Sequence, residues 1–171
     1  MKPGRICFLV FVLIVGFGCD KSVDTDEELL GLGSGGSGGT GMGTLISMAD
    51  GTLKRIEELH IGDMVSSDDG SASGIKNILS GMTEKIYSIN TKSGKSILVV
   101  GGQPIKSSDG WISANELKVG TLIIGKDGNE TIEFISLQTY NKRVYLLQFN
   151  VATGFVANGL VIGDFNISYQ Q

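Results

Sequence analysis

The second half of the chain repeats the first half at a fixed spacing, and this repeat restricts the fold more than any other feature. Glu58–Gly62 (ELHIG) returns about 58 residues later as Glu116–Gly120 (ELKVG). At the same offset Asp69-Gly70 returns as Asp127-Gly128. Repeated units of this kind bury their apolar faces against one another. We therefore expect a pseudo-twofold fold in which both halves share one core.

Between the repeats the chain consists of short apolar runs separated by turn dipeptides such as Asp50-Gly51, Asp109-Gly110 and Asn158-Gly159. Such pairs between β-rich runs are typical of hairpins. No long segment has the 3.6-residue period of a helix, and only Arg55–Leu59 is predicted as a helical turn. The fold class is therefore all-β. The expected strands are 44–48, 64–66, 75–80, 85–91, 96–100, 122–124, 131–140, 143–150 and 154–156.

The first residues are typical of a secretory signal. Met1–Arg5 is basic, and Ile6–Phe17 is an apolar run of about a dozen residues, too short to span a bilayer as a helix. The sequence Gly16–Cys19 (GFGC) resembles a bacterial lipobox, although Phe17 departs from the usual pattern. We interpret residues 1–18 as a lipoprotein signal peptide and Cys19 as the lipidated residue, whose acyl chains (palmitate among them) would anchor the protein. A plain signal peptide with an incidental cysteine is the alternative.

A polar segment follows the cysteine. Asp20–Glu28 is acidic, and Gly33–Gly43 is rich in glycine and serine. Such a composition buries little apolar surface and is typical of a flexible linker. A phosphate-binding loop is not indicated, because no Gly-Lys-Ser/Thr follows. We therefore predict a tether over residues 19–38, a globular domain over 39–164 and a short tail over 165–171.

Composition excludes several classes of function. The net charge of −4 and the pI of about 4.9 argue against a nucleic-acid partner, because binding the phosphate backbone requires clustered Lys and Arg side chains. One histidine and two cysteines cannot form a structural zinc site, which needs four ligands. The carboxylates of Asp68-Asp69 and Asp127–Glu130 match no calcium-loop spacing and are interpreted as turn residues. We therefore predict no metal and no cofactor. A domain of this size can fold without a disulfide.

Three blocks of sequence, in this order, resemble the Hint domain that inteins, hedgehog autoprocessing domains and bacterial toxin-processing domains share. The first is Gly43–Thr52 with Ile56–Val65, the second runs from Gln103-Pro104-Ile105 to Glu116–Gly120, and the third includes Phe155–Ile162. The resemblance implies a flat, horseshoe-shaped, all-β disk with pseudo-twofold symmetry over residues 39–164.

The resemblance also implies where catalytic residues should lie. In the family, a Cys or Ser nucleophile begins the domain, a Thr-x-x-His element assists at the first junction, and a His-Asn pair closes the domain. In this chain the nucleophile position is Gly39, the Thr-x-x-His positions are Val100 and Gln103, and the closing pair is Gly163 and Asp164. All five family positions carry a different residue.

These replacements remove the chemistry that the family requires. Glycine at 39 has no side chain to attack the preceding carbonyl, and glutamine at 103 cannot transfer a proton near neutral pH. Thr40 and Thr44 are the nearest alternative nucleophiles, but neither Gln103 nor Gly163 can act as their base. His60, the only histidine, is expected to be a solvated surface residue. We therefore predict no catalytic residues.

The sequence thus predicts a lipid-anchored protein of the bacterial cell envelope whose Hint-like domain has lost self-cleavage and serves as a binding or structural module. It would contact the membrane through its anchor and bind an unidentified envelope protein. The alternative is an active domain that performs protein splicing or self-cleavage, including a residual cut after Asp164. The sequence does not distinguish the inner from the outer membrane.

Overall fold

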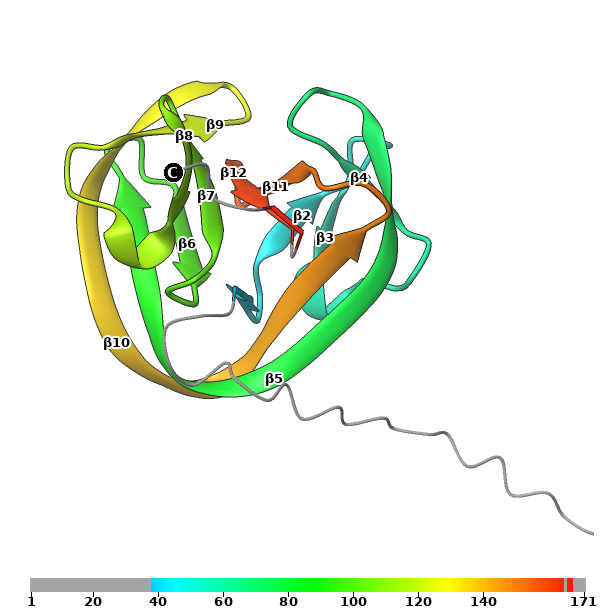
Figure 1. Cartoon of the computed structure of the whole chain (residues 1–171), viewed down its shortest axis with the longest axis horizontal. Coiled ribbons are helices and arrows are strands. Elements are labelled where there is room, and N and C mark those ends of the chain that lie inside the picture. The colour runs from blue at the N-terminus through cyan, green and yellow to red at the C-terminus, as the bar shows by residue number, and fades with distance from the viewer. Residues whose placement is uncertain (1–37, 165, 168–171) are drawn as a thin grey trace, which may run out of the picture.

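The computed structural model describes residues 38–164 and 166–167. The predicted signal peptide, Cys19, the tether up to Ser37, and most of the tail lie outside these residues. Within the described part, strands make up nearly the whole domain, and no helix is long and apolar enough to cross a membrane. Two long strands curve around the outside and enclose the shorter ones, which gives the horseshoe outline in Figure 1. The prediction of an all-β fold is confirmed.

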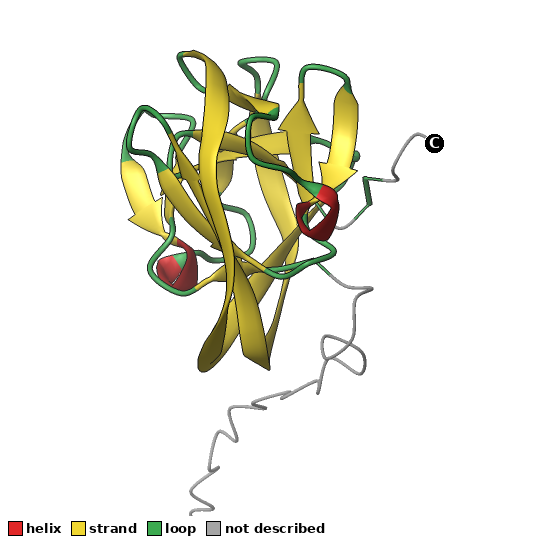
Figure 2. Ribbon diagram, turned by 90° about the vertical axis from the view of Figure 1, so that its left-hand side faces the viewer, coloured by secondary structure: helices red, strands yellow, loops and turns green. Residues whose placement is uncertain are grey.

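Within the described residues, twelve strands and two short 3-10 helices follow one another. Their bounds are β1 Thr40–Gly41, β2 Leu45–Ser47, β3 Leu53–Arg55, η1 Ile56–Glu58, β4 Met64–Ser66, β5 Ala72–Thr91, β6 Ser96–Val99, β7 Pro104–Ser107, β8 Gly110–Ser113, η2 Ala114–Glu116, β9 Leu122–Gly125, β10 Gly128–Phe149, β11 Gly154–Ala157 and β12 Leu160–Gly163. Figure 2 shows that the two helical turns are small features at the rim of a strand framework.

The sequence repeat is also a repeat of structure. Six elements of the first half, β2, β3, η1, β4, β5 and β6, are followed in the same order by β7, β8, η2, β9, β10 and β11. The hydrogen bonds repeat as well. The Gly62 N–H donates to the Ile75 carbonyl at 2.8 Å, and the Gly120 N–H donates to the Ile132 carbonyl at 2.8 Å. The predicted pseudo-twofold arrangement is therefore present at the level of individual backbone contacts.

The two longest strands, β5 and β10, pair with each other in antiparallel register and join the halves. The register pairs Ile89 with Ile135 near one end and Leu79 with Leu146 near the other, with an irregularity between Thr139 and Lys142. The sequence predicted two strands in each of these regions, and that prediction was wrong. The polar residues between the apolar runs continue the pairing, because a ladder of backbone hydrogen bonds does not require apolar side chains.

Five strands were absent from the prediction: β1, β3, β7, β8 and β12. Each has only two to four residues, and β3 (Leu53–Arg55) alternates in a pattern too short to identify. β7 (Pro104–Ser107) begins with proline, which usually argues against a strand. Proline is tolerated there because it is the first residue of the strand, where a missing N–H costs least.

The core lies inside the horseshoe and receives matching residues from both halves. Ile46 and Ile105, Leu59 and Leu117, and Ile75 and Ile132 occupy corresponding places, and all are buried. The rings of Phe149 and Phe155 pack with their centroids 5.5 Å apart. Burying this apolar surface is the main source of stability for a domain of this size.

A smaller apolar cluster covers strand β1, which lies between β10 and β6. Thr40 pairs with Tyr145 on one side and with Val99 on the other. A Cβ added to Gly41 would lie 2.9 Å from the Leu98 Cβ, so the side chains of the cluster pack directly against the backbone of Gly41. The first residues of the domain are thus built into the middle of the sheet.

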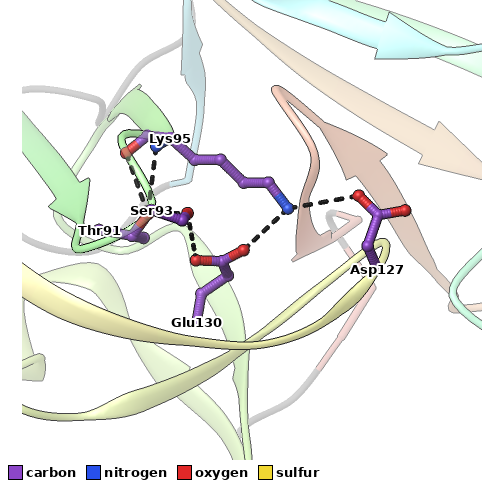
Figure 3. Close-up of polar contacts among 5 residues, drawn as sticks. All are labelled: Thr91, Ser93, Lys95, Asp127 and Glu130. Atoms are coloured by element: carbon purple, nitrogen blue, oxygen red, sulfur yellow. Dashed lines mark hydrogen bonds and ion pairs between the residues drawn. The ribbon is translucent and has the colours of Figure 1, made fainter.

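The acidic turn residues make local contacts. Figure 3 shows that Lys95 bridges two of them: its Nζ lies 2.9 Å from Glu130 Oε1 and 3.6 Å from Asp127 Oδ2. Ser93 also donates to Glu130. This network links the β5–β6 turn to the β9–β10 turn. In the other half, Asp69 Oδ1 accepts the Ser71 N–H at 2.9 Å.

Candidate functional site

The five family positions come together although they lie far apart in the sequence. Gly39, the residue before β1, lies at the end of β6, where the Val100 N–H donates to the Gly39 carbonyl at 2.8 Å. A turn follows, closed by the Gln103 N–H donating to the Val100 carbonyl at 2.9 Å. Strand β12 brings Gly163 to the same place from the end of the domain. Gln103 lies at the centre of this group.

The side chain of Gln103 joins the first residue of the domain to the penultimate one. It is 1% exposed. Its Oε1 accepts the Gly39 N–H at 2.8 Å, and its Nε2 donates to the Gly163 carbonyl at 2.6 Å. A backbone N–H can only donate and a carbonyl can only accept, so both groups are satisfied by one orientation of the amide. The main chain of Gln103 is fixed too, because its carbonyl accepts the Ala114 N–H at 3.0 Å.

Glycines leave the space that this arrangement needs. A Cβ at Gly38 would lie 2.8 Å from Gln103 Oε1, and a Cβ at Gly163 would lie 2.8 Å from the Pro104 Cβ. Gly39 has a φ of +151°, which residues with a side chain rarely adopt. At each of these three positions a side chain would therefore either press against its neighbours or strain the backbone.

Val100 contributes only apolar surface. It belongs to the cluster with Ile86 and Val144. Its Cγ2 lies 3.4 Å from the place where a Gly39 Cβ would be. Valine offers no hydroxyl to a backbone at this junction, so its role here is packing.

Asp164 is fully buried and acts as an acceptor for the residues around it. Its Oδ1 accepts the Asn166 N–H at 3.0 Å. Its Oδ2 accepts Asn166 Nδ2 at 3.2 Å and the Phe149 N–H at 3.4 Å. Burial raises the pKa of the Asp164 carboxyl above its ordinary value, while these hydrogen bonds oppose the shift. Sequence reasoning missed Asn166, although Asp-x-Asn is a pattern typical of a side chain that caps its own turn.

The remaining candidates lie elsewhere or are already engaged. Thr44 Oγ1 donates to the Gly41 carbonyl at 2.7 Å, within the turn that ends β1. His60 is exposed, and its backbone N–H donates to Asp63 Oδ2 at 2.8 Å. Among residues 38–164 and 166–167, no group of His, Cys, Asp and Glu side chains is arranged to hold a metal ion.

With this geometry established, comparison with solved structures identifies the fold as that of inteins. The crystal structure of the gp41-1 intein matches with a TM-score of 0.66 and 21% identity, over 74% of this chain and 98% of the intein. A DnaB intein from Synechocystis sp. PCC 6803 matches with a TM-score of 0.63 and 21% identity, over 75% and 99%. A bacterial intein-like domain from Clostridium thermocellum matches with a TM-score of 0.64 and 20% identity, over 74% and 97%.

No family model matches the sequence, and no curated protein matches it by sequence. The identities to the solved structures are low, so they establish the fold and no more. The chain has an intein-like (Hint) all-β fold, which agrees with the resemblance read from its sequence.

Proposed function

We propose that this chain is a lipid-anchored bacterial envelope protein whose intein-like domain does not cut or splice itself and serves as a binding or structural module. The observation that carries the proposal is the hydrogen-bonded bridge made by Gln103. A carboxamide that spans Gly39 and Gly163 holds the two ends of the domain together and can neither give nor take a proton near neutral pH.

At the first junction, between Gly38 and Gly39, cleavage requires a nucleophile and an acid. Gly39 has no side chain, and the Gly39 nitrogen that would have to leave donates to Gln103 Oε1. Proton transfer to a leaving amine contributes about 10²- to 10⁴-fold to such reactions. The absence of both groups supports a domain that remains whole at this end.

At the second junction, between Asp164 and Phe165, the Asp164 carboxylate is the group that could attack the peptide bond. The Asp164 carboxyl is, however, held as an acceptor by Asn166 and by the Phe149 N–H. Position 163 is glycine, so no side chain there can protonate the leaving nitrogen. These contacts support a structural role for Asp164 and argue against its attack on the Asp164–Phe165 peptide bond.

The proposal that the domain is held at the cell envelope is argued from the sequence. Basic residues, a short apolar run and Gly-Phe-Gly-Cys at positions 16–19 support lipidation of Cys19, and the Gly/Ser-rich stretch supports a tether between anchor and domain. Metabolic labelling with palmitate is expected to mark the wild type and not the Cys19→Ala variant. Equal labelling of the two would contradict the anchor.

Intact-mass measurement tests whether the domain cuts or splices itself. The purified chain is incubated for days at neutral pH with and without a thiol reductant or hydroxylamine, which release thioesters. We expect one constant mass. A product ending at Gly38 would contradict the proposal at the first junction, and a product ending at Asp164 would contradict it at the second. A ligated product would assign splicing activity to the domain.

Gly39→Cys and Gly39→Cys/Gln103→His are the matched variants for this assay. The single variant restores a nucleophile without an acid, and we expect no cleavage. The double variant restores both, and thiol-dependent cleavage in this variant alone would show that the replaced residues are what keeps the domain whole. Cleavage of the single variant would contradict the role assigned to Gln103.

A further inference from the structure

We propose that the hydrophobic groove at the waist of the β5–β10 ribbon binds the Leu29–Leu32 segment of this same chain. The groove has a volume of about 660 Å³, within the range of sites that bind small ligands. The proposal concerns residues on the amino-terminal side of the domain and does not depend on whether Cys19 is lipidated.

The groove lies where β5 and β10 change register. Met82 and Leu137 contribute apolar surface and are 62% and 52% exposed. Asn141, which has a φ of +49°, lines the groove at the irregularity. Val100 and Gly101, in the turn that leads to Gln103, also line the groove. An open apolar surface framed by polar groups is typical of a binding site.

The described chain begins beside this groove. Gly39 lies against Val100, one of the groove's walls, and the pairing of β1 with β6 runs antiparallel. Because Thr40 pairs with Val99 in antiparallel register, Gly38, the first described residue, lies on the side on which Gly101 follows Val100. A Cβ added to Gly101 would lie 3.1 Å from Tyr87 Cε2. Because glycine has no side chain, position 101 leaves this part of the groove unfilled.

The sequence supplies a suitable occupant within reach. Leu29, Leu30 and Leu32 form the main apolar cluster between Cys19 and Gly38. Leu32 lies six positions before Gly38 in the sequence, and an extended chain advances about 3.3–3.6 Å per residue, which gives a reach of roughly 20 Å. The segment can therefore reach the groove without rearranging the domain.

Charge favours the same occupant. Asp24, Asp26, Glu27 and Glu28 precede the leucines. On the ribbon, Lys142 pairs in register with Thr83 and Arg143 pairs with Met82, so two exposed cations lie beside the groove. The lining itself adds one cation, Lys85, and one anion, Glu84, so cations are in excess around the groove. Opposite charges on a short connection of this kind select the orientation in which the leucines enter first and the acidic residues lie over the cations.

Disulfide trapping in the full chain, purified in a mild detergent, tests the proposal. In a Cys7→Ser/Cys19→Ser background, Leu30→Cys is combined with Met82→Cys in the groove or with Leu53→Cys on β3. Met82 and Leu53 are 62% and 59% exposed, so the two positions are matched in accessibility. A docked segment raises the effective concentration of its cysteine at the groove, and we expect the Met82→Cys pair to close about tenfold faster.

Two results of the trapping experiment would overturn the proposal. Equal rates for the two pairs would mean that the segment samples the surface without preference. A disulfide-linked dimer in place of the intramolecular product would assign the groove to a second copy of the chain. As an independent readout, Leu29→Asp/Leu30→Asp/Leu32→Asp is expected to speed amide hydrogen exchange at 82–85 and 100–101 several-fold, and leave that of the β12 amides unchanged. Unchanged exchange at the groove would also contradict docking.

Discussion

Gln103 is the single side chain on which the closed form of the site depends, and its removal should be costly. Gln103→Ala leaves the buried Gly39 N–H and Gly163 carbonyl without partners. Each unsatisfied group costs about 1–3 kcal/mol, so for the two groups we expect a loss of about 2–6 kcal/mol in the free energy of unfolding, measured by urea denaturation. Gln138→Ala, at an exposed position on β10, is the matched control and should change stability by about 0.5 kcal/mol or less. Equal effects at both positions would contradict the bridging role.

Asp164 should make stability depend on pH in a recognisable way. Because burial raises the pKa of its carboxyl, the folded protein holds this proton more tightly than the unfolded chain. Stability from this group is therefore fully present below about pH 4 and is lost as the pH rises through the raised pKa. Relative to Asp164→Asn, the wild type should lose stability over that interval and then remain level. Urea unfolding of both proteins between about pH 4 and pH 8 measures the difference.

Asn is the family residue at this position, so each D164N sample needs an intact-mass measurement to show that the chain is whole. A difference between wild type and variant that is constant with pH would contradict the assigned shift. So would a difference that moves in favour of the wild type as the pH rises.

At the scale of elements, β1 should tolerate no added volume. In Gly41→Ala the new methyl group would lie 2.9 Å from Leu98 Cβ and 3.0 Å from Tyr140 Oη, and overpacking of this kind costs about 1–3 kcal/mol. Gly74→Ala on β5 is the control, because its Cβ would meet only Met64 Sδ at 3.3 Å. Its stability should change by about 0.5 kcal/mol or less. Thermal unfolding of both variants measures the contrast, and a Gly41→Ala variant as stable as the control would contradict the tight packing around β1.

The elements also show what the sequence could and could not predict. The repeat around Glu58–Gly62 and Glu116–Gly120 predicted the two halves, because a short-range pattern of turn and apolar residues is written directly in the sequence. The continuous β5 and β10 could not be predicted, because each is extended by pairing with the other over distant residues. Local propensity at Gly81–Lys85 carries no information about that partner.

The same distinction applies to the candidate site. The resemblance placed Gly39, Gln103 and Gly163 at corresponding family positions, and the structure brings Gly39 and Gly163 each within hydrogen-bond distance of the Gln103 side chain. The bridge itself could not be predicted, because it requires β12 to approach the turn after β6. Whether these positions are catalytically silent is still a prediction, which the mass measurements above address.

For the whole molecule, folding should be slow. Strand β2 pairs Ile46 with Ala157, and β1 pairs Thr40 with Tyr145, so strands from the beginning of the domain close against strands from its end. Domains dominated by such long-range pairing fold in milliseconds to seconds. Stopped-flow fluorescence of Trp111, the only tryptophan, can follow refolding. Complete refolding within microseconds would contradict this topology.

The Gln103 bridge also determines how the domain would respond to tension. The two ends of the domain, Gly39 and Gly163, are joined by the Gln103 carboxamide in addition to the backbone pairs of the strands at these ends, β1 and β12. If the amino-terminal side were held at a surface and the carboxyl-terminal side were pulled, the two carboxamide hydrogen bonds would share the load with those strand pairs. Without Gln103 the strand pairs would bear the load alone, so a variant that lacks this side chain should unfold at a lower pulling force than the wild type.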